Sequence, residues 1–427
     1  MNSTQITIPF IKKTRVRSLP VYLLFLVWPF ALLTASLRNF RDPNAKRGFI
    51  LFCVYFGFVF VFSRDIQGAD SARYAQNLVD LHGFAPSLLT LWNSFYSFDT
   101  NLLDIYQPVT TWLVSLFTDN AHFLFAIFSF VFGYFYAQNI WIILNNISGK
   151  KSIIVWIYIL LFILIIPLWY INGVRMYTAA QIFIYGVFLY LLGNNRKGLI
   201  WSSASLLFHF SFLLPVAILF LYSILPRKLP IYFLFFIVTA FIAEIDLFTI
   251  RNYLSFLPDI FQPRVIAYTN SDYAIGVNEA YKDTVWYVRY AEPALRLTIY
   301  SLLSVLVVSR SKIFSKDPLL FSLICFALFF YGWSNLAAHM PSGARFQTVA
   351  NFLSVAALLL FFIKYKSSIA LKLLRFISLP VILYYCIVSI RIGFDFIGLS
   401  TFIGNPFTAF LFEDKIPIIE IIKSLLG

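Results

Sequence analysis

The sequence predicts an all-α, polytopic integral membrane protein in which residues 1–427 form a single membrane domain. Composition is the first indication, because 60% of the residues are hydrophobic and only 12% are charged. An average soluble domain has roughly 25% charged residues. The second indication is that apolar runs close to the ~20 residues of a membrane span recur from residue 19 to residue 391. The longest remaining stretch, about 244–293, is too short for a typical soluble catalytic domain. Any chemistry is therefore expected in loops and at helix ends.

Eleven apolar runs are candidate spans, and a twelfth segment is ambiguous, so we expect about 11–12 transmembrane helices. The first run follows a basic stretch and is interpreted as a retained span rather than a signal sequence. The run 199–225 is interrupted near His209 and by Pro215, so it forms one tilted helix or two halves turning at His209. The twelfth segment, 101–118, contains Asp104 and Gln107 and is expected to be a re-entrant or interfacial helix. The eleven runs are 19–37, 48–63, 121–143, 152–170, 177–193, 199–225, 231–243, 294–309, 318–333, 346–363 and 376–390.

Charge predicts the two sides of the membrane. Six short connections hold 17 basic and two acidic residues, which is typical of cytoplasmic loops. They are 38–48, 149–152, 194–198, 226–230, 310–317 and 364–375. The remaining connections hold 12 basic and 17 acidic residues and are expected outside, with long outward loops at 64–120 and 244–297. This alternation requires a hairpin in 199–225 and no crossing by 101–118. It also places the basic N-terminal tail outside, against the same rule.

Motifs for metals, cofactors and nucleotides are missing from the sequence. The four histidines form no HExxH motif, and the three cysteines lie far apart in apolar runs. The chain has no CxxC, EF-hand, Walker A or GxGxxG pattern. We therefore predict no metal site and no cofactor. The net charge of +14 is attributed to membrane orientation, so nucleic acid is not an expected partner, whereas membrane lipids are.

Ionisable residues next to the membrane are the candidate functional residues, because such positions are costly without a partner or water. Asp70 and Tyr74 lie one helical turn apart after the second span. Asp70 could accept a proton from a sugar hydroxyl, or it could cap its helix or pair with Arg73. Arg175 lies in a short turn at a helix start and suits a diphosphate, with interfacial snorkelling as the alternative. His209 stands alone in an apolar run and is either a proton-transfer residue or a packed, hydrogen-bonded histidine.

Five further residues are expected to bind an anionic substrate from outside. Arg345 begins a helix after a turn that contains His339. Arg289 and Arg296 are seven residues apart and would share one helix face. Arg391 lies at the outward end of the last span. Several arginines and an acid on one side of the membrane indicate a lipid-linked anionic substrate.

Four segments, in this order, carry a resemblance to a known family. They are Gly68-Ala69-Asp70-Ser71-Ala72-Arg73-Tyr74, Val174-Arg175-Met176-Tyr177-Thr178-Ala179-Ala180, Phe208-His209-Phe210-Ser211 and Ala344-Arg345-Phe346. Over roughly residues 48–407 the chain resembles the EpsG family of exopolysaccharide and O-antigen polymerases, the Wzy-like proteins. The ending Arg391-Ile392-Gly393-Phe394-Asp395, followed by Asn405-Pro406, fits the same pattern. Met176 departs from it, because the family often has Gln there.

The resemblance implies a glycosyltransferase of the GT-C type in the bacterial inner membrane, with its active site facing the periplasm. Such an enzyme would transfer a glycan from polyprenyl diphosphate to the non-reducing end of a second lipid-linked repeat unit, without a nucleotide. Its partners would be the lipid-linked donor and acceptor, and a chain-length regulator is left open. The resemblance makes Asp70 the candidate base, assigns the diphosphates to Arg175, Arg289 and Arg345, and lets His209 position Arg175 or a phosphate.

Two alternatives share parts of this chemistry. A transporter or flippase for lipid-linked oligosaccharide would also use arginines, although near the bilayer midplane and often in repeated halves. An O-antigen-type ligase would share the donor chemistry. Sugar identity, linkage, stereochemical outcome and oligomeric state are not expected to be readable from the sequence.

Overall fold

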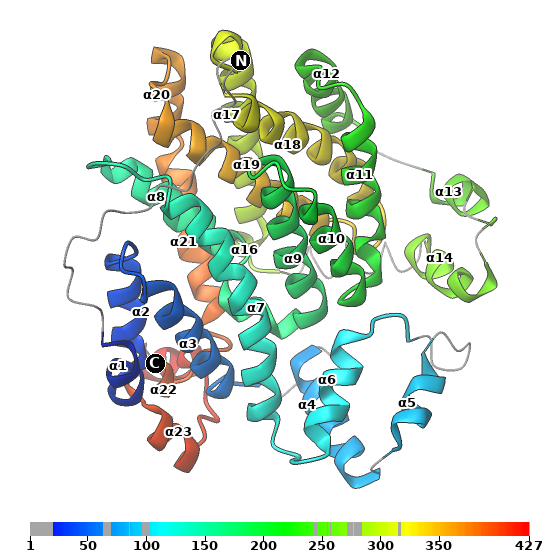
Figure 1. Cartoon of the computed structure of the whole chain (residues 1–427), viewed down its shortest axis with the longest axis vertical. Coiled ribbons are helices and arrows are strands. Elements are labelled where there is room, and N and C mark those ends of the chain that lie inside the picture. The colour runs from blue at the N-terminus through cyan, green and yellow to red at the C-terminus, as the bar shows by residue number, and fades with distance from the viewer. Residues whose placement is uncertain are drawn as a thin grey trace.

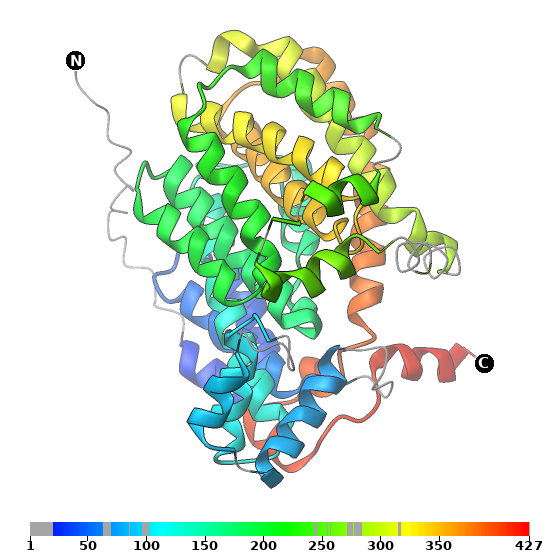
Figure 2. The same cartoon turned by 90° about the vertical axis from the view of Figure 1, so that its right-hand side faces the viewer.

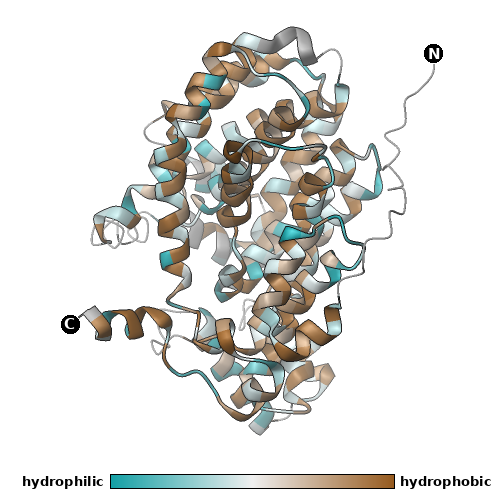
Figure 3. Ribbon diagram, turned by 90° about the vertical axis from the view of Figure 1, so that its left-hand side faces the viewer, coloured by the Kyte–Doolittle hydropathy of each residue, from teal (hydrophilic) through white to brown (hydrophobic). Residues whose placement is uncertain are grey.

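The chain is an all-α protein whose helices are those of a polytopic membrane protein, as predicted. The computed structural model describes residues 20–62, 70–84, 86–95, 102–242, 246–253, 255–256, 258–270, 276, 284–314 and 317–426. Within these ranges there are isolated bridges but no β-strand. Hydrophobic residues predominate along the helices of the bundle (Figure 3). The basic N-terminal tail and the segment Ser63–Ala69, both used in the sequence analysis, lie outside the described residues.

The helices follow one another along the chain with short connections (Figure 1). The first part contains α1 Val21–Val27, α2 Pro29–Arg38, α3 Ala45–Phe58, α4 Asp70–Phe84, α5 Leu88–Ser94, α6 Tyr106–Ser115 and α7 Ala121–Leu144. The middle part contains α8 Ile153–Ile165, η1 Leu168–Gly173, α9 Val174–Leu191, α10 Lys197–Ala204, η2 Ser205–Leu207, η3 Phe210–Phe212, α11 Leu213–Ile224 and α12 Leu229–Ala240. The loop helices are α13 Leu247–Tyr253, η4 Asp259–Phe261, α14 Gln262–Tyr268 and α16 Trp286–Arg289. The last part contains α17 Ala291–Phe314, α18 Pro318–Ala337, α19 Arg345–Lys364, α20 Ile369–Ile377, α21 Leu379–Gly393, α22 Ser400–Ile403, α23 Pro406–Leu411 and α24 Ile418–Leu426.

Fewer helices are long enough to cross a bilayer alone than the eleven or twelve spans expected. Among the described residues, five helical segments combine sufficient length with sufficient hydropathy, and the bent pair α20–α21 would make six. They are 121–144, 153–191, 286–309, 318–337 and 345–364. The other apolar runs form shorter helices, such as the 12-residue α12, because local breaks end them before the ~20 residues of a full span.

Two of these breaks have visible causes. The first predicted span is split at Trp28, whose φ of −157° is not helical and which is followed by Pro29, a residue without an amide hydrogen. The run 199–225 is split at His209, which is extended with φ −154° and ψ 115°. The structure therefore forms two halves around His209, the second of the two alternatives that the sequence allowed.

A third break redirects the chain at η1, the turn that directly precedes α9 and Arg175. The segment 153–191 has the length of one 39-residue helix, yet the Gln181 side chain donates to the Ile166 carbonyl at 3.5 Å. In a straight α-helix these residues would lie about 22 Å apart. The six-residue η1 between α8 and α9 therefore redirects the chain, and Arg175 lies directly after this turn.

Glycines allow close contacts between neighbouring helices. A Cβ built on Gly186 of α9 would lie 2.5 Å from the Gly198 carbonyl and 2.3 Å from the Ser202 hydroxyl, both in α10. A Cβ on Gly57 of α3 would lie 2.2 Å from the Phe125 carbonyl of α7. Small residues at helix interfaces are the usual means of close packing in membranes, where lipid is as apolar as the helix surface.

The basic connections meet at one end of the bundle. Arg41 donates to the Ile147 carbonyl just beyond α7, and Lys151 donates to the Ile363 carbonyl at the end of α19. Lys364 then pairs with Asp317 at 3.2 Å. Arg345 lies at the other end of α19, about 28 Å of helix from Lys364. The bundle therefore separates the predicted cytoplasmic charges from the candidate site residues.

The opposite end carries α4, α5 and α6, which lie together beyond the bundle (Figure 1). With ten residues, α6 is too short to span a bilayer, in keeping with the expectation that 101–118 does not cross. The C-terminal helix α24 projects away from the bundle at this same end (Figure 2). The α4–α6 segment positions the acidic residue on which the candidate site is built.

Candidate functional site

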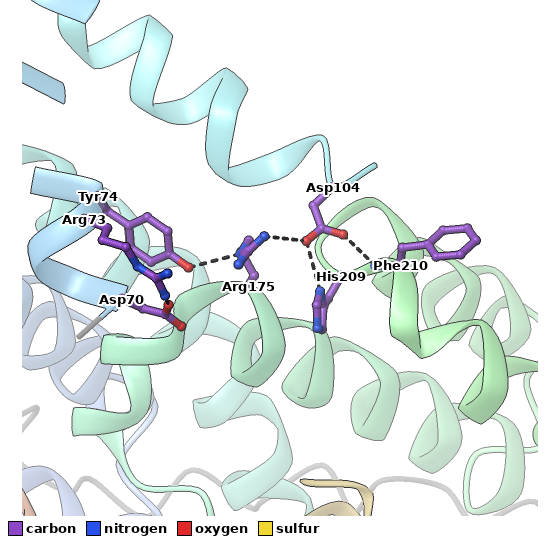
Figure 4. A network of polar contacts seen from close by, with 7 residues as sticks. All are labelled: Asp70, Arg73, Tyr74, Asp104, Arg175, His209 and Phe210. Atoms are coloured by element: carbon purple, nitrogen blue, oxygen red, sulfur yellow. Dashed lines mark hydrogen bonds and ion pairs between the residues drawn. The ribbon is translucent and has the colours of Figure 1, made fainter. Parts of the chain in front are cut away.

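A buried carboxylate joins two of the predicted site residues. Asp104 precedes α6, and its side chain is 7% exposed. Its Oδ2 accepts from Arg175 Nη1 at 3.1 Å and from His209 Nδ1 at 3.0 Å. Its Oδ1 accepts from the Phe210 amide at 2.7 Å. Figure 4 shows these groups, from two separate parts of the chain, converging on the carboxylate of Asp104.

Arg175 is held on a second side by a tyrosine. Its Nε donates to the Tyr74 hydroxyl at 3.0 Å, and the guanidinium carbon lies 6.0 Å from the centre of that ring. Burial raises the pKa of Tyr74 above its ordinary value, so the hydroxyl stays protonated at neutral pH. No acceptor among the described residues is paired with Arg175 Nη2, and the side chain is 32% exposed. Two contacts thus fix the plane of the guanidinium and leave one edge available for a ligand.

Asp104 is a carboxylate at neutral pH. Burial alone would raise its pKa, but hydrogen bonds from His209 and the Phe210 amide, together with the nearby Arg175 charge, hold the pKa below its ordinary value. An ionised carboxylate can only accept hydrogen bonds, so His209 Nδ1 is the donor in their contact. The second ring nitrogen, Nε2, has no partner among the described residues, and His209 lines a cavity. This arrangement presents an oriented imidazole nitrogen to that cavity.

Local folding explains how Asp104 reaches these partners. The Ile105 amide donates to the Leu207 carbonyl at 3.0 Å, which ties the start of α6 to the break in 199–225. The rings of Tyr106 and Phe208 lie 4.3 Å apart and reinforce the same contact. Because His209 is extended, the amide of Phe210 has no helical partner and can bond the carboxylate instead. The helix break therefore forms part of the site.

An apolar cavity of about 760 Å³ adjoins this network. It is lined mainly by hydrophobic side chains from α11, α14, α18 and α19, including Leu213, Val265 and Trp333. Two of the candidate polar residues, His209 and Arg345, also line it. The cavity has the size and character typical of sites for hydrophobic ligands that carry one polar end.

Asp70 lies beside this network rather than inside it. Its carboxylate pairs with Arg73 in the first turn of α4, which is the alternative pairing considered for the sequence (Figure 4). The Asp70 charge also acts on Arg175, although the two do not form an ion pair within 4 Å. The carboxylate in direct contact with Arg175 is that of Asp104.

The remaining predicted residues are distributed over neighbouring contacts. Arg296 donates to Gln347 at 2.5 Å, between α17 and α19. Arg289 ends α16 with its guanidinium 5.2 Å from the centre of the Tyr290 ring. Arg391 pairs with Asp395 at 2.8 Å, while His339 lies in the partly exposed turn between α18 and α19.

Asp104 was not predicted as a site residue. The sequence signal was present, because an aspartate in an apolar segment is costly without a partner. It was interpreted only as evidence that 101–118 does not cross the membrane. Its partners lie 71 and 105 residues away along the chain, which no local pattern reveals.

The site can bind an anion next to a hydrophobic chain. A fixed guanidinium and a second arginine supply positive charge, and the cavity supplies apolar surface. The described part of the chain contains no group of three or more His, Cys, Asp or Glu side chains placed to hold a metal ion. Comparison of the chain with protein-family models, curated proteins and solved structures finds no match in any of the three.

Proposed function

We propose that the protein is a polysaccharide polymerase, a glycosyltransferase that joins repeat units carried on polyprenyl diphosphate. It would transfer the growing glycan to the non-reducing end of a second lipid-linked unit, on the periplasmic face of the bacterial inner membrane. The observation that carries the proposal is the position of Arg175, which is held by Tyr74 and by the same buried carboxylate that orients His209 on the wall of the apolar cavity.

The proposed substrate matches both halves of this site. A diphosphate accepts paired hydrogen bonds from the planar fork of an arginine, and one edge of Arg175 has no partner among the residues that the structure describes. Arg345, at the start of α19, supplies a second charge on the same cavity as His209. The apolar lining would hold the first part of the isoprenoid chain. A free sugar or a soluble nucleotide would leave that lining unused.

The chemistry is a displacement at the anomeric carbon of the donor. An acceptor hydroxyl forms the new C–O bond and loses its proton to a general base, for which Asp70 is the candidate. The bond between that carbon and the diphosphate oxygen breaks, and its electron pair leaves with the lipid diphosphate. Negative charge then grows on the departing oxygen. Arg175 and Arg345 would offset this charge from fixed positions, which is the electrostatic form of transition-state stabilisation. His209 Nε2 would contact a phosphate oxygen from the cavity side.

The test is the size of the product. Purified protein in lipid would be supplied with the native polyprenyl-diphosphate repeat unit, and the product would be resolved on a gel. The wild type should give a ladder of repeat lengths. Arg175→Lys should lower the rate about a hundredfold, since it removes the planar fork while keeping a charge. The matched control, Arg41→Lys, changes an arginine at the opposite end of the bundle and should keep the ladder.

Other results would identify other functions. An undiminished ladder from Arg175→Lys would refute the role given to this site. A repeat unit that becomes accessible across the bilayer without growing would indicate a flippase, and transfer to lipid A or protein in place of growth would indicate a ligase.

A further inference from the structure

The helix α20 presents an exposed apolar face. It lies at the edge of the bundle, at the end opposite α4–α6 (Figure 1), and it is bent by 40° relative to α21. Its large apolar side chains are 58–85% exposed and recur at helical spacing, so they share one side of the helix. They are Ile369, Leu373, Phe376 and Ile377. In a membrane protein such a face is expected to contact the acyl chains of the bilayer.

Two basic side chains lie along one border of this face. Lys372 is exposed and Arg375 is partly exposed, and their spacing of three residues places them next to each other on the helix. Around the helix axis both lie between the exposed apolar face and the buried Leu371. None of the ion pairs formed within the described ranges includes either residue. The border of the apolar face therefore carries two uncompensated positive charges.

The protein positions Arg375 without giving it an anion. The guanidinium carbon lies 4.9 Å from the centre of the Phe362 ring in α19, which holds the plane of the group. Its Nε is buried and has no hydrogen-bond acceptor among the described residues. A buried donor without an acceptor is costly, and a phosphate oxygen is a strong acceptor for a guanidinium. This arginine therefore points to an anionic ligand from outside the protein.

The sequence around α20 does not supply this anion. The connection 364–375 contains four basic residues and no acidic one. The carboxylate of Asp317, at the same end of the bundle, already accepts from Lys364 and from the Tyr365 hydroxyl, each at 3.2 Å. The start of α20 is fixed by Ser368, whose hydroxyl donates to that of Ser309 in α17 at 3.2 Å. The two basic residues are thus held at a defined place on the bundle.

We propose that α20 lies in the membrane interface and that Lys372 and Arg375 bind the headgroup of an anionic phospholipid. The apolar face would enter the acyl region, and the basic border would then lie at the level of the lipid phosphates. A free phosphate or a soluble acidic partner would leave the exposed apolar side chains uncovered. The inference does not depend on the polymerase function, because α20 and the candidate site lie at opposite ends of the bundle.

The helix α24 offers a comparison within the same chain. It also has nine residues and an apolar side, on which Leu425 is 79% exposed. Its charged residues are Glu420 and Lys423, which cancel, whereas α20 carries two basic residues and no acidic one. Both helices are expected to contact lipid. Only α20 is expected to distinguish an anionic from a neutral headgroup.

The test measures which lipid surrounds each helix. A fluorescent label is attached to Ile369→Cys on α20 or to Leu425→Cys on α24 in the full-length protein, whose own three cysteines are buried. Quenching by brominated phosphatidylglycerol is compared with quenching by brominated phosphatidylcholine in reconstituted bilayers. Each basic residue at the surface favours anionic lipid about fivefold, so the α20 label should report a preference of about 25-fold. The α24 label should report about equal quenching.

Substitutions assign the preference to the two side chains. Lys372→Gln and Arg375→Gln should each lower it to about fivefold, and the double variant should show about equal quenching by the two lipids. Arg375→Lys keeps the charge and should retain most of the preference. Lys423→Gln on α24 is the matched control and should leave the preference at α20 unchanged. Because Lys372 is exposed, its variant tests the proposal even if Arg375→Gln does not fold.

Three results would overturn the proposal. The first is equal quenching of the α20 label by both lipids in the otherwise unchanged protein. The second is no quenching by either lipid, which would show that a second copy of the chain or another protein covers α20. The third is a preference that disappears when inorganic phosphate replaces chloride at equal ionic strength, because the basic residues would then bind a free anion rather than a lipid.

Discussion

Removing the charge of Asp104 should destabilise the fold as well as the site. Asp104→Asn keeps the shape of the side chain but leaves Arg175 beside a neutral amide at about the same distance. Breaking a buried ion pair by removing one partner costs about 3–5 kcal/mol. Arg175 is 32% exposed and water can compensate part of this loss, so we expect about 2–3 kcal/mol, nearer to the value of a hydrogen bond to a charged group.

The assay is the free energy of unfolding in mixed micelles, from a denaturant titration followed by tryptophan fluorescence. A double-mutant cycle with Arg175→Met isolates the pair. The double variant should cost little more than the worse single variant, with a coupling energy of about 1.5 kcal/mol or more. Asp119→Asn, at an exposed aspartate between α6 and α7, is the matched control and should leave the unfolding free energy unchanged. Additive single effects would refute the reasoning that Asp104 and Arg175 act as one unit.

Three further predictions concern stability. The folded pKa of Asp104 lies below its ordinary value of 3.8, so its contribution to the free energy of unfolding is complete above that value and is lost at lower pH. The difference in unfolding free energy between wild type and Asp104→Asn should therefore stay constant down to about pH 4 and then shrink. Gly186→Ala should cost about 3 kcal/mol by overpacking the α9–α10 contact, whereas Gly83→Ala, with open space around it, should be neutral or stabilising in the same titration. Asp317→Ala removes the N-cap that accepts from the Leu320 amide and should cost about 1 kcal/mol; a loss near zero would contradict the capping role.

The fold class could be predicted because the hydropathy of a segment depends only on its own residues. Long apolar runs identify α7, α18 and α19 without knowledge of their partners. Helix ends were harder to predict, since they depend on tertiary contacts. The break at His209 could be suspected from its polarity, whereas its extended backbone exists because the Phe210 amide has Asp104 as an acceptor. Similarly, the separate runs 152–170 and 177–193 predict a turn between α8 and α9, but they do not reveal that Gln181 contacts the Ile166 carbonyl.

In the candidate site, too, the polar residues could be predicted from the sequence but their contacts could not. Arg175, His209 and Tyr74 could be predicted because each is a polar side chain at an apolar segment, where it is costly without a partner. This criterion can be applied to one residue at a time. Asp104 meets the same criterion, but in the sequence it is equally explained by a segment 101–118 that does not cross the membrane. What distinguishes a site residue from a tolerated polar residue is its partner, and partners are set by packing. Contacts between residues 71 or 105 positions apart are therefore where prediction from this sequence stops.

One carboxylate holds two site residues that separate parts of the fold put in place. Arg175 is placed by the turn at η1, His209 by the break before α11, and both are held by one carboxylate from the segment before α6. The α4–α6 segment lies beyond the bundle, so the docking of this segment against the bundle also orients the guanidinium of Arg175. A substrate that binds Arg175 would also stabilise the docking of that segment. Ligand binding and local order at this end of the protein should therefore rise together.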